Sequence, residues 1–215
     1  MKKNSIGIAL AVVFLVSCTS DDISGSGVPT TENRDLNAFI AVSADGIADV
    51  NIVQGNAQSV KVTADDNIIG LVKTEVKDGI LEVYLSSGHN YKNIDVSLEI
   101  MAKGLNGVAN KGSGTMKVDN VDNPEFYLNN SGSGDISLSG ASNTLRIENE
   151  GSGRISGFTF LADTCAIEAI GSGDVEISCM DELDVIIDGS AKVFYKGNPL
   201  ITKNISGSGN VIDGN

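Results

Sequence analysis

Two aspartates with an arginine between them are the residues of this chain whose types and spacing come nearest to a catalytic set. Asp135, Arg154 and Asp174 each stand three residues after the first glycine of a Gly-Ser-Gly tripeptide. If successive tripeptides lie on neighbouring strands, the two aspartates are two strands apart, with about 10 Å between their backbones. That separation approaches the distance between the two carboxyl groups of an inverting glycosidase.

The same column also fits a structural role, in which acidic and basic side chains pair across strands. We favour this interpretation because no aromatic platform or groove-forming loop flanks it. His89 is the only histidine, in an expected exposed hairpin loop, so no Ser-His-Asp or Cys-His set can be assembled. The repeats also lack the regularly placed aspartate of calcium-binding nonapeptide arrays. We therefore expect no catalytic residues, no metal site and no cofactor.

The serines of the tripeptides suggest binding instead. With the charged column they form a candidate ligand-facing strip, which consists of Ser133, Asp135, Ser152, Arg154, Ser172 and Asp174. Small side chains would let a glycan, a protein or another β edge approach closely. A tight structural corner would explain the same serines, and the sequence leaves both interpretations open.

The tripeptides recur at a nearly fixed interval. Their first glycines are Gly112, Gly132, Gly151, Gly171 and Gly207, and the variant Gly189-Ser190-Ala191 fills the last gap. Successive repeats are thus 20, 19, 20, 18 and 18 residues apart. A period near 20 is typical of a solenoid, in which each repeat is too small to bury its own apolar face.

Alignment on the first glycine shows columns with the period of a β-strand. Four residues after the glycine every repeat has an apolar residue: Met116, Ile136, Ile155, Val175, Val193 and Val211. Even offsets are mostly apolar and odd offsets mostly polar, which predicts strands with one buried face. The same parity places Asn110, Asn130 and Asn149 inside, where stacked amides can hydrogen bond to neighbouring coils. Lys203 breaks an apolar column in the last full repeat, where an end cap would lie.

The fold class predicted is therefore all-β: a single-stranded parallel β-helix built from repeats of about 18–20 residues, with a β-rich N-terminal part. Candidate strands in that part are 38–43, 48–53, 58–64, 80–85 and 94–100. We find no linker within 37–215, so we expect one domain of about nine coils. The composition of 25 Gly, 3 Pro and no Trp suits a narrow β stack.

The N-terminus resembles a bacterial lipoprotein signal. Residues 1–18 have a basic head, an apolar run too short to span a bilayer, and the lipobox-like end Leu15-Val16-Ser17-Cys18. We expect cleavage before Cys18 and lipid attachment to it; an ordinary secretory signal with a chance cysteine is the alternative. Thr19 resembles the outer-membrane choice, and Ser20-Asp21-Asp22 resembles a surface-export tag. The polar segment 19–36 is predicted to be a flexible tether.

Charge and cysteine content limit the partners. The net charge of −13 becomes −15 once Lys2 and Lys3 leave with the signal. Such a chain repels nucleic acid and leaves cationic partners open. Cys165 falls in an inward column and Cys179 near a coil corner, and the columns do not stack them. We favour two buried thiols over a disulfide, although export would permit the bond.

Three tracts resemble the head-GIN-domain family of auto-transporter adhesins. They are FYKGNPLITKNISGSGNV (Phe194–Val211), the repeated GSGDI/GSGDV, and VKVTADDNIIGLVKTEVKDGILEVYL (Val60–Leu85). The resemblance covers about residues 37–212 and implies a right-handed parallel β-helix, common among exported lipoproteins. Ala191 in place of a repeat glycine and Arg154 between two aspartates depart from the repeat pattern.

Three functions are compatible with these observations. The first is a non-catalytic binding or adhesion module displayed on an outer-membrane lipoprotein, at the cell surface or on the periplasmic side. The second is a structural or assembly lipoprotein whose open solenoid ends stack on a partner or on another copy. The third is a polysaccharide-active enzyme on the same scaffold. The resemblance favours the first.

Overall fold

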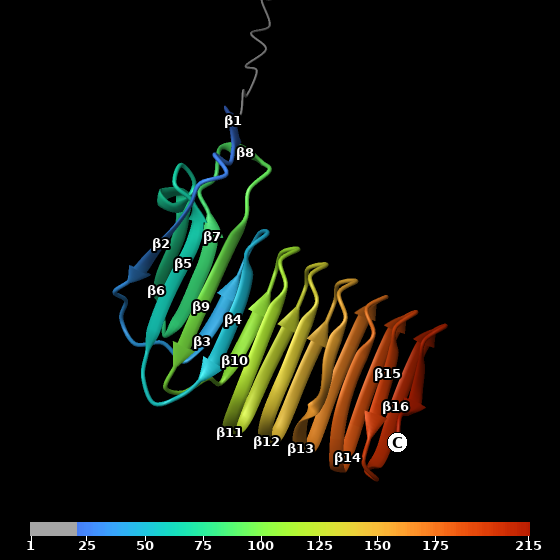
Figure 1. Cartoon of the computed structure of the whole chain (residues 1–215). Coiled ribbons are helices and arrows are strands. Elements are labelled where there is room, and N and C mark those ends of the chain that lie inside the picture. The colour runs from blue at the N-terminus through green and yellow to red at the C-terminus, as the bar shows by residue number, and fades with distance from the viewer. Residues whose placement is uncertain (1–20) are drawn as a thin grey trace, which may run out of the picture.

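A computed structural model describes residues 21–215 of the chain (Figure 1). The predicted signal, its lipidated Cys18 and Thr19 lie outside the described residues. Strands make up most of the described chain, with a single 3-10 turn, η1 (Ile69–Leu71). In this part of the chain, no helix is long and apolar enough to cross a membrane.

The strands follow one another with short connections along the whole chain. In chain order they are β1 (Asp21–Ser24), β2 (Pro29–Arg34), β3 (Ala41–Ala44), β4 (Asp49–Gln54), β5 (Ser59–Asp65), β6 (Val72–Lys77), β7 (Ile80–Leu85), β8 (His89–Lys92), β9 (Val96–Ala102), β10 (Gly107–Asn110), β11 (Met116–Asn130), β12 (Ile136–Asn149), β13 (Ile155–Gly171), β14 (Val175–Gly189), β15 (Lys192–Lys196), β16 (Leu200–Gly207) and β17 (Asn210–Asp213). All five strands expected in the N-terminal part are present, within a few residues of their predicted bounds.

The C-terminal part is a parallel solenoid of about five turns. Met116, Ile136, Ile155, Val175, Val193 and Val211 pair in register from one coil to the next. The first five of these are at most 2% exposed, which confirms the predicted inward parity. The coils stack because each buries apolar side chains only with the help of its neighbours.

Each coil has two extended halves joined at the Gly-Ser-Gly turn, and the core lies between them (Figure 1). We call the outward side of the halves that follow the tripeptides the front face, and the outward side of the halves that precede them the rear face. Lys117, Ser137, Ser156 and Glu176 lie on the front face in one row. Tyr127, Arg146, Ala166 and Asp184 form the corresponding row on the rear face.

The parallel ladder gives way to antiparallel strands near the N-terminus, so the expectation of nine coils is wrong. β3 and β4 still pair in parallel with β10 and β11, but β6 is antiparallel to β7, and β5 to β9. Asp78 and Gly79 both have positive φ, 50° and 77°, as in a two-residue hairpin turn. Such a turn reverses the chain at once, so the chain does not wind around the core.

The flexible tether predicted for 19–36 is also wrong from Asp21 onward. β1 pairs with β8, and β2 pairs antiparallel with β5 through six residues. The physical reason is that β5 offers an open edge whose N–H and C=O groups need partners. The polar side chains of β2 stay largely exposed while its backbone completes the sheet.

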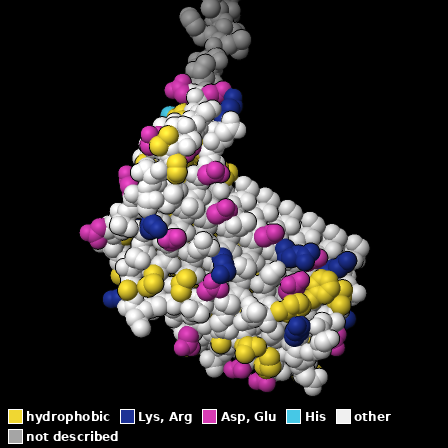
Figure 2. Space-filling view, viewed as in Figure 1, with side chains coloured by type: hydrophobic (Ala, Val, Ile, Leu, Met, Phe, Trp, Pro, Cys, Tyr) yellow, Lys and Arg dark blue, Asp and Glu magenta, His cyan; other side chains and the backbone are white. Residues whose placement is uncertain are grey.

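The C-terminal end of the solenoid has no such covering strand among the described residues. β17 pairs only with β15, and β16 only with β14. Lys203 lies on β16 opposite Val185 and is exposed, as expected for the last coil. On the face seen in Figure 2, acidic and basic side chains are interspersed, and one small group of hydrophobic side chains gathers over β15.

Candidate functional site

The six serines of the repeats lie exposed at successive turns along one edge of the solenoid. Backbone hydrogen bonds hold the turns together; Ser133 N, for example, donates to Gly112 O of the preceding coil at 3.0 Å. Within the described residues, no hydrogen bond involves the hydroxyl group of Ser133, Ser152 or Ser172. Their hydroxyl groups are therefore available to a ligand, as the candidate strip requires.

The flanking glycines allow these turns to stack in contact. A Cβ atom on Gly153 would lie 2.1 Å from the carbonyl oxygen of Gly134 and 2.8 Å from Nδ2 of Asn130. Real atoms do not approach so closely, so glycine is required at this position for steric reasons. Ala191 fills the equivalent position in its own coil, is buried, and leaves Val193 in register with Val175.

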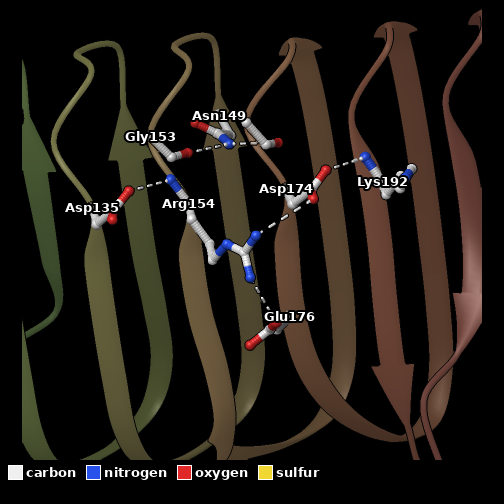
Figure 3. A network of polar contacts seen from close by, with 8 residues as sticks. Asp135, Asn149, Gly153, Arg154, Asp174, Glu176 and Lys192 are labelled. Carbon is white, nitrogen blue, oxygen red and sulfur yellow. Dashed lines mark hydrogen bonds and ion pairs between the residues drawn. The ribbon is translucent and has the colours of Figure 1, made fainter.

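The buried asparagines form the predicted ladder behind the turns. Asn149 Nδ2 donates to the carbonyl oxygen of Gly153 at 3.2 Å and to that of Gly173, one coil further, at 3.0 Å (Figure 3). Asn130 Nδ2 donates to Gly134 O at 3.3 Å and to Asn149 Oδ1 at 3.2 Å. These bonds offset the cost of burying amides and fix the turn of each coil against the next.

The charged column lies on the front side of the turns, with its side chains directed toward one another (Figure 3). Asp135 Oδ1 accepts a hydrogen bond from the backbone N–H of Arg154 at 2.7 Å. Asp174 Oδ1 accepts one from the backbone N–H of Lys192 at 2.9 Å. Arg154 Nη1 lies 3.5 Å from Glu176 Oε1, and its Nη2 lies 3.9 Å from Asp174 Oδ2.

The same geometry recurs at Asp49, whose Oδ1 accepts from the backbone N–H of Thr115 at 2.8 Å. In each case an aspartate satisfies a backbone donor of the next coil. This repeated capping explains the aspartate column by structure, as we favoured from the sequence. Arg154 occupies the space between the two aspartates, where an inverting glycosidase would need room for water and sugar.

The rear face carries a row of three hollows that the sequence analysis did not predict. Their volumes are about 210, 320 and 180 Å³, and they follow one another along the stacking direction. Tyr127 lines both the first and the second hollow, and Arg146 lines both the second and the third. The row therefore forms one shallow channel across several coils.

The chemistry of the wall changes along this channel. The first hollow is mainly apolar, with Ala41, Ile80 and Gly107 in its wall. Asn106, Thr144 and Arg146 give the second hollow hydrogen-bonding groups. Glu148, Glu168 and Asp184 make the third acidic, and these residues are listed here only as its wall. An extended molecule could thus make apolar, neutral polar and charged contacts in sequence.

Tyr127 stands at the centre of the channel with 38% of its surface exposed. Its hydroxyl group hydrogen bonds to the Glu148 carboxylate, which also accepts from Asn129 Nδ2 at 3.2 Å. Burial and then the hydrogen bond with Glu148 raise the pKa of the Tyr127 phenol. The ring is held in place as an apolar surface with a polar end, a combination that is enriched at binding interfaces. A large outward residue opposite Gly107 in the preceding coil was the sequence signal for it.

His89 is not in an exposed loop, as expected, but begins strand β8 opposite Asp21 of β1. Its ring is half-buried and meets the ring of Tyr91 edge-on, with 5.9 Å between the ring centres. The described residues contain no group of three or more His, Cys, Asp or Glu side chains arranged to hold a metal ion.

Cys165 and Cys179 are both buried thiols. The structure nevertheless places their side chains in hydrogen-bonding contact, which the column alignment did not predict. They lie at the corner of the solenoid opposite to the Gly-Ser-Gly turns and take no part in the strip or the channel.

Comparison with known proteins agrees with this architecture. The model of the family described as "Putative auto-transporter adhesin, head GIN domain" matches residues 38–199, and the chain belongs to this family. No curated protein matches the chain by sequence.

Solved structures share the fold at low sequence identity. A protein of Bacteroides fragilis described as a putative adhesin superposes with a TM-score of 0.72 at 20% identity, over 89% of this chain and 99% of that one. One of Parabacteroides distasonis described as a putative lipid binding protein gives 0.61 at 24%, over 91% and 100%. One of Parabacteroides merdae described as a putative adhesin gives 0.57 at 20%, over 91% and 100%.

Proposed function

We propose that this protein is a cell-envelope lipoprotein that displays a non-catalytic β-solenoid for binding, as an adhesin does. The rear-face channel is the observation that carries this proposal, because it offers contiguous and chemically varied contacts over several coils. Extended ligands, such as a glycan or a protein segment, match its length better than a compact molecule does. Family membership supports the adhesive role.

Cys18 anchors the protein in this proposal, with the outer membrane as the expected location. An anchor at the N-terminus would leave the solenoid projecting from the end that bears β1 and β8. Surface display follows from the adhesive role, and a periplasmic position belongs to the alternative below.

Binding to glycan arrays and to immobilised surface proteins tests the proposal, with a matched pair of variants. Arg146→Ala removes a cation from the channel, whereas Arg154→Ala removes one from the front face. We expect Arg146→Ala and Tyr127→Ala to weaken binding at least about tenfold, as central interface residues do, and Arg154→Ala to leave it unchanged. Loss of binding in Arg154→Ala alone would instead place the ligand on the strip of Ser133, Asp135, Ser152, Arg154, Ser172 and Asp174.

A structural or assembly lipoprotein is the second candidate, and the edges of β16 and β17 favour it. Both strands have an unpaired edge in the described structure, which is a ready template for another chain. Concentration-dependent oligomers that disappear when Ile205 or Val211 is replaced by lysine would support assembly. A monomer at all concentrations, together with ligand binding, would support adhesion.

Polysaccharide hydrolysis is the third candidate and has less structural support. Its motivating carboxylates, Asp135 and Asp174, each accept a backbone hydrogen bond from the next coil. Release of reducing ends from a polysaccharide, abolished by Asp135→Ala in a folded protein, would revive this candidate.

A further inference from the structure

Two buried cysteines meet at a bulge between neighbouring coils. Cys165 on β13 and Cys179 on β14 are 3% and 0% exposed. Ala162 pairs with Cys179, and Thr164 pairs with Glu182, so two steps along β13 match three along β14. This extra residue is a bulge, which shifts one strand against the other. Both cysteines point into the core at this corner, on adjacent coils.

The sulfur atom of Cys179 lies within a small set of hydrogen bonds. Its thiol donates to the carbonyl oxygen of Glu182 at 3.0 Å. The thiol and the backbone N–H of Cys165 both hydrogen bond to the Cys179 sulfur. The hydrogen bond from the Cys165 thiol is the main reason why the pKa of Cys179 is lowered, whereas the same bond and burial raise the pKa of Cys165. Cys179 is therefore the thiol that ionises first.

A hollow in the surface lies beside the pair. Its volume is about 470 Å³, and Ala162, Asp163 and Met180, which neighbour the two cysteines along the chain, line it. Cys179 Sγ is 3.6 Å from the carbonyl oxygen of Asp163. A small thiol reagent in this hollow is separated from the sulfur atoms by little more than one layer of atoms.

We propose that Cys165 and Cys179 are a thiol–disulfide pair that closes to a covalent bond between adjacent coils. Such a bond would join positions 14 residues apart in the sequence. It would hold β14, and the coils beyond it, to β13 near the open end of the solenoid. Exported compartments permit such bonds, so the pair would be oxidised where an adhesin works.

The oxidant is the disulfide of a second molecule, such as glutathione disulfide. The Cys179 thiolate attacks one of its sulfur atoms, and the other leaves as a thiolate that takes up the proton lost by Cys179. Cys165 then loses its proton and attacks the Cys179 sulfur, releasing the second glutathione, which takes up that proton. Two protein thiols and one disulfide thus become one protein disulfide and two thiols, and the reductant and oxidant balance.

Mass spectrometry of the full chain in glutathione buffers tests the pair directly. Cys18→Ala serves as the background, so that Cys165 and Cys179 are the only thiols. After unfolding and alkylation, we expect two alkyl groups from the reducing buffer and none from the oxidising one, with a cross-linked Cys165–Cys179 peptide. Two alkyl groups after prolonged oxidation, or a lasting glutathione adduct, would overturn the proposal.

Single replacements test the order of attack. In the same background, Cys165→Ala should stop at a glutathione adduct on Cys179, because no second thiol can displace the glutathione. Cys179→Ala should leave Cys165 unmodified under the same conditions. An adduct in Cys179→Ala but not in Cys165→Ala would contradict the assigned nucleophile.

Thermal unfolding supplies a measurement that does not depend on the replacements. A cross-link over 14 residues restricts the unfolded chain, so the oxidised protein should unfold about 5–10 °C above the reduced protein. Cys165→Ala should show no difference between the two buffers. Equal midpoints for the oxidised and reduced forms of the pair would show that no stabilising bond forms between the coils.

Discussion

The Asp135 carboxylate accepts a 2.7 Å hydrogen bond from the backbone N–H of Arg154, the residue that takes its place in the next coil. Asp49 and Asp174 do the same for Thr115 and Lys192. These donors would otherwise have no strand partner at the point where the turn ends. The acidic column thus stabilises the stack through the backbone, which leaves the ligand contacts to other side chains.

Replacing Asp135 with alanine should weaken the stack modestly. The Arg154 N–H is exposed and can turn to water, so we expect a loss of about 1 kcal/mol and a melting temperature about 2–4 °C lower. Asp135→Asn keeps an acceptor oxygen and should lose less. Ser133→Ala is the control, because the Ser133 hydroxyl makes no hydrogen bond within the described residues. Equal midpoints for Asp135→Ala and Ser133→Ala would show that the cap contributes nothing.

Replacing Gly153 with alanine should be more damaging. The new Cβ would lie 2.1 Å from Gly134 O, and only a shift of one coil against the next can relieve that contact. We expect a loss of about 1–3 kcal/mol, as for other overpacked sites, measured by urea unfolding. Gly104→Ala is the matched control, because a Cβ there meets nothing within 4 Å. Similar losses in the two variants would show that the close stacking of the turns is unimportant.

Sequence periodicity was sufficient to predict the stack because side-chain parity alone decides which face a strand buries. The columns through Ile155, the asparagine ladder around Asn130 and the exposed serines were all predicted correctly. Parity carries no information about a strand that reverses at a turn such as Asp78-Gly79. It also assumes constant register, and therefore missed the bulge that brings Cys179 to Cys165.

The rear channel was hidden for a different reason. A hollow arises from the difference in size between neighbouring outward residues, such as Tyr127 and Gly107, and from the course of the chain around them. Column analysis sorts residues by direction and polarity and ignores their size. Polar outward positions therefore looked equivalent on both faces, and the serine strip was chosen for its regularity.

Ile155→Asp tests the inward parity itself. Ile155 is fully buried and pairs in register with Ile136 and Val175, so the new carboxylate would be buried without a partner. Burial of an unpaired charge is costly enough that we expect loss of cooperative unfolding in circular dichroism melts. Ser137→Asp, an outward neighbour on the next coil, should melt within a few degrees of the unmodified protein. A normal melt for Ile155→Asp would contradict the parity assignment.

Asp119 should make stability depend on pH in the acidic range. Lys117, as the main cause, and Ser139 hydrogen bond to its carboxylate and lower its pKa below the usual 3.8. A pKa lowered in the folded state contributes stability above the unfolded value, and this contribution is lost as pH falls through the folded value. Asp119→Asn should therefore lose less stability than the unmodified protein between pH 7 and about pH 2.

The difference should be under about 1 kcal/mol because the pair is at the surface. Urea midpoints at neutral and acidic pH measure it, and Ser139→Ala should fall between the two proteins. An unchanged pH dependence in Asp119→Asn would show that these contacts do not favour the charged form of Asp119.

Anchoring through Cys18 predicts that a single replacement changes the behaviour of the whole protein in membranes. Without the cysteine thiol no lipid can be attached, so Cys18→Ala should move the protein from the detergent phase to the aqueous phase in phase partitioning. Ser17→Ala is the neighbouring control and should stay in the detergent phase. Cys18→Ala that remains in the detergent phase would contradict the lipid anchor. For the lipidated protein, protease treatment of intact cells then decides the side of the membrane: loss of the solenoid means surface display, and protection until the outer membrane is opened would favour the assembly role over adhesion.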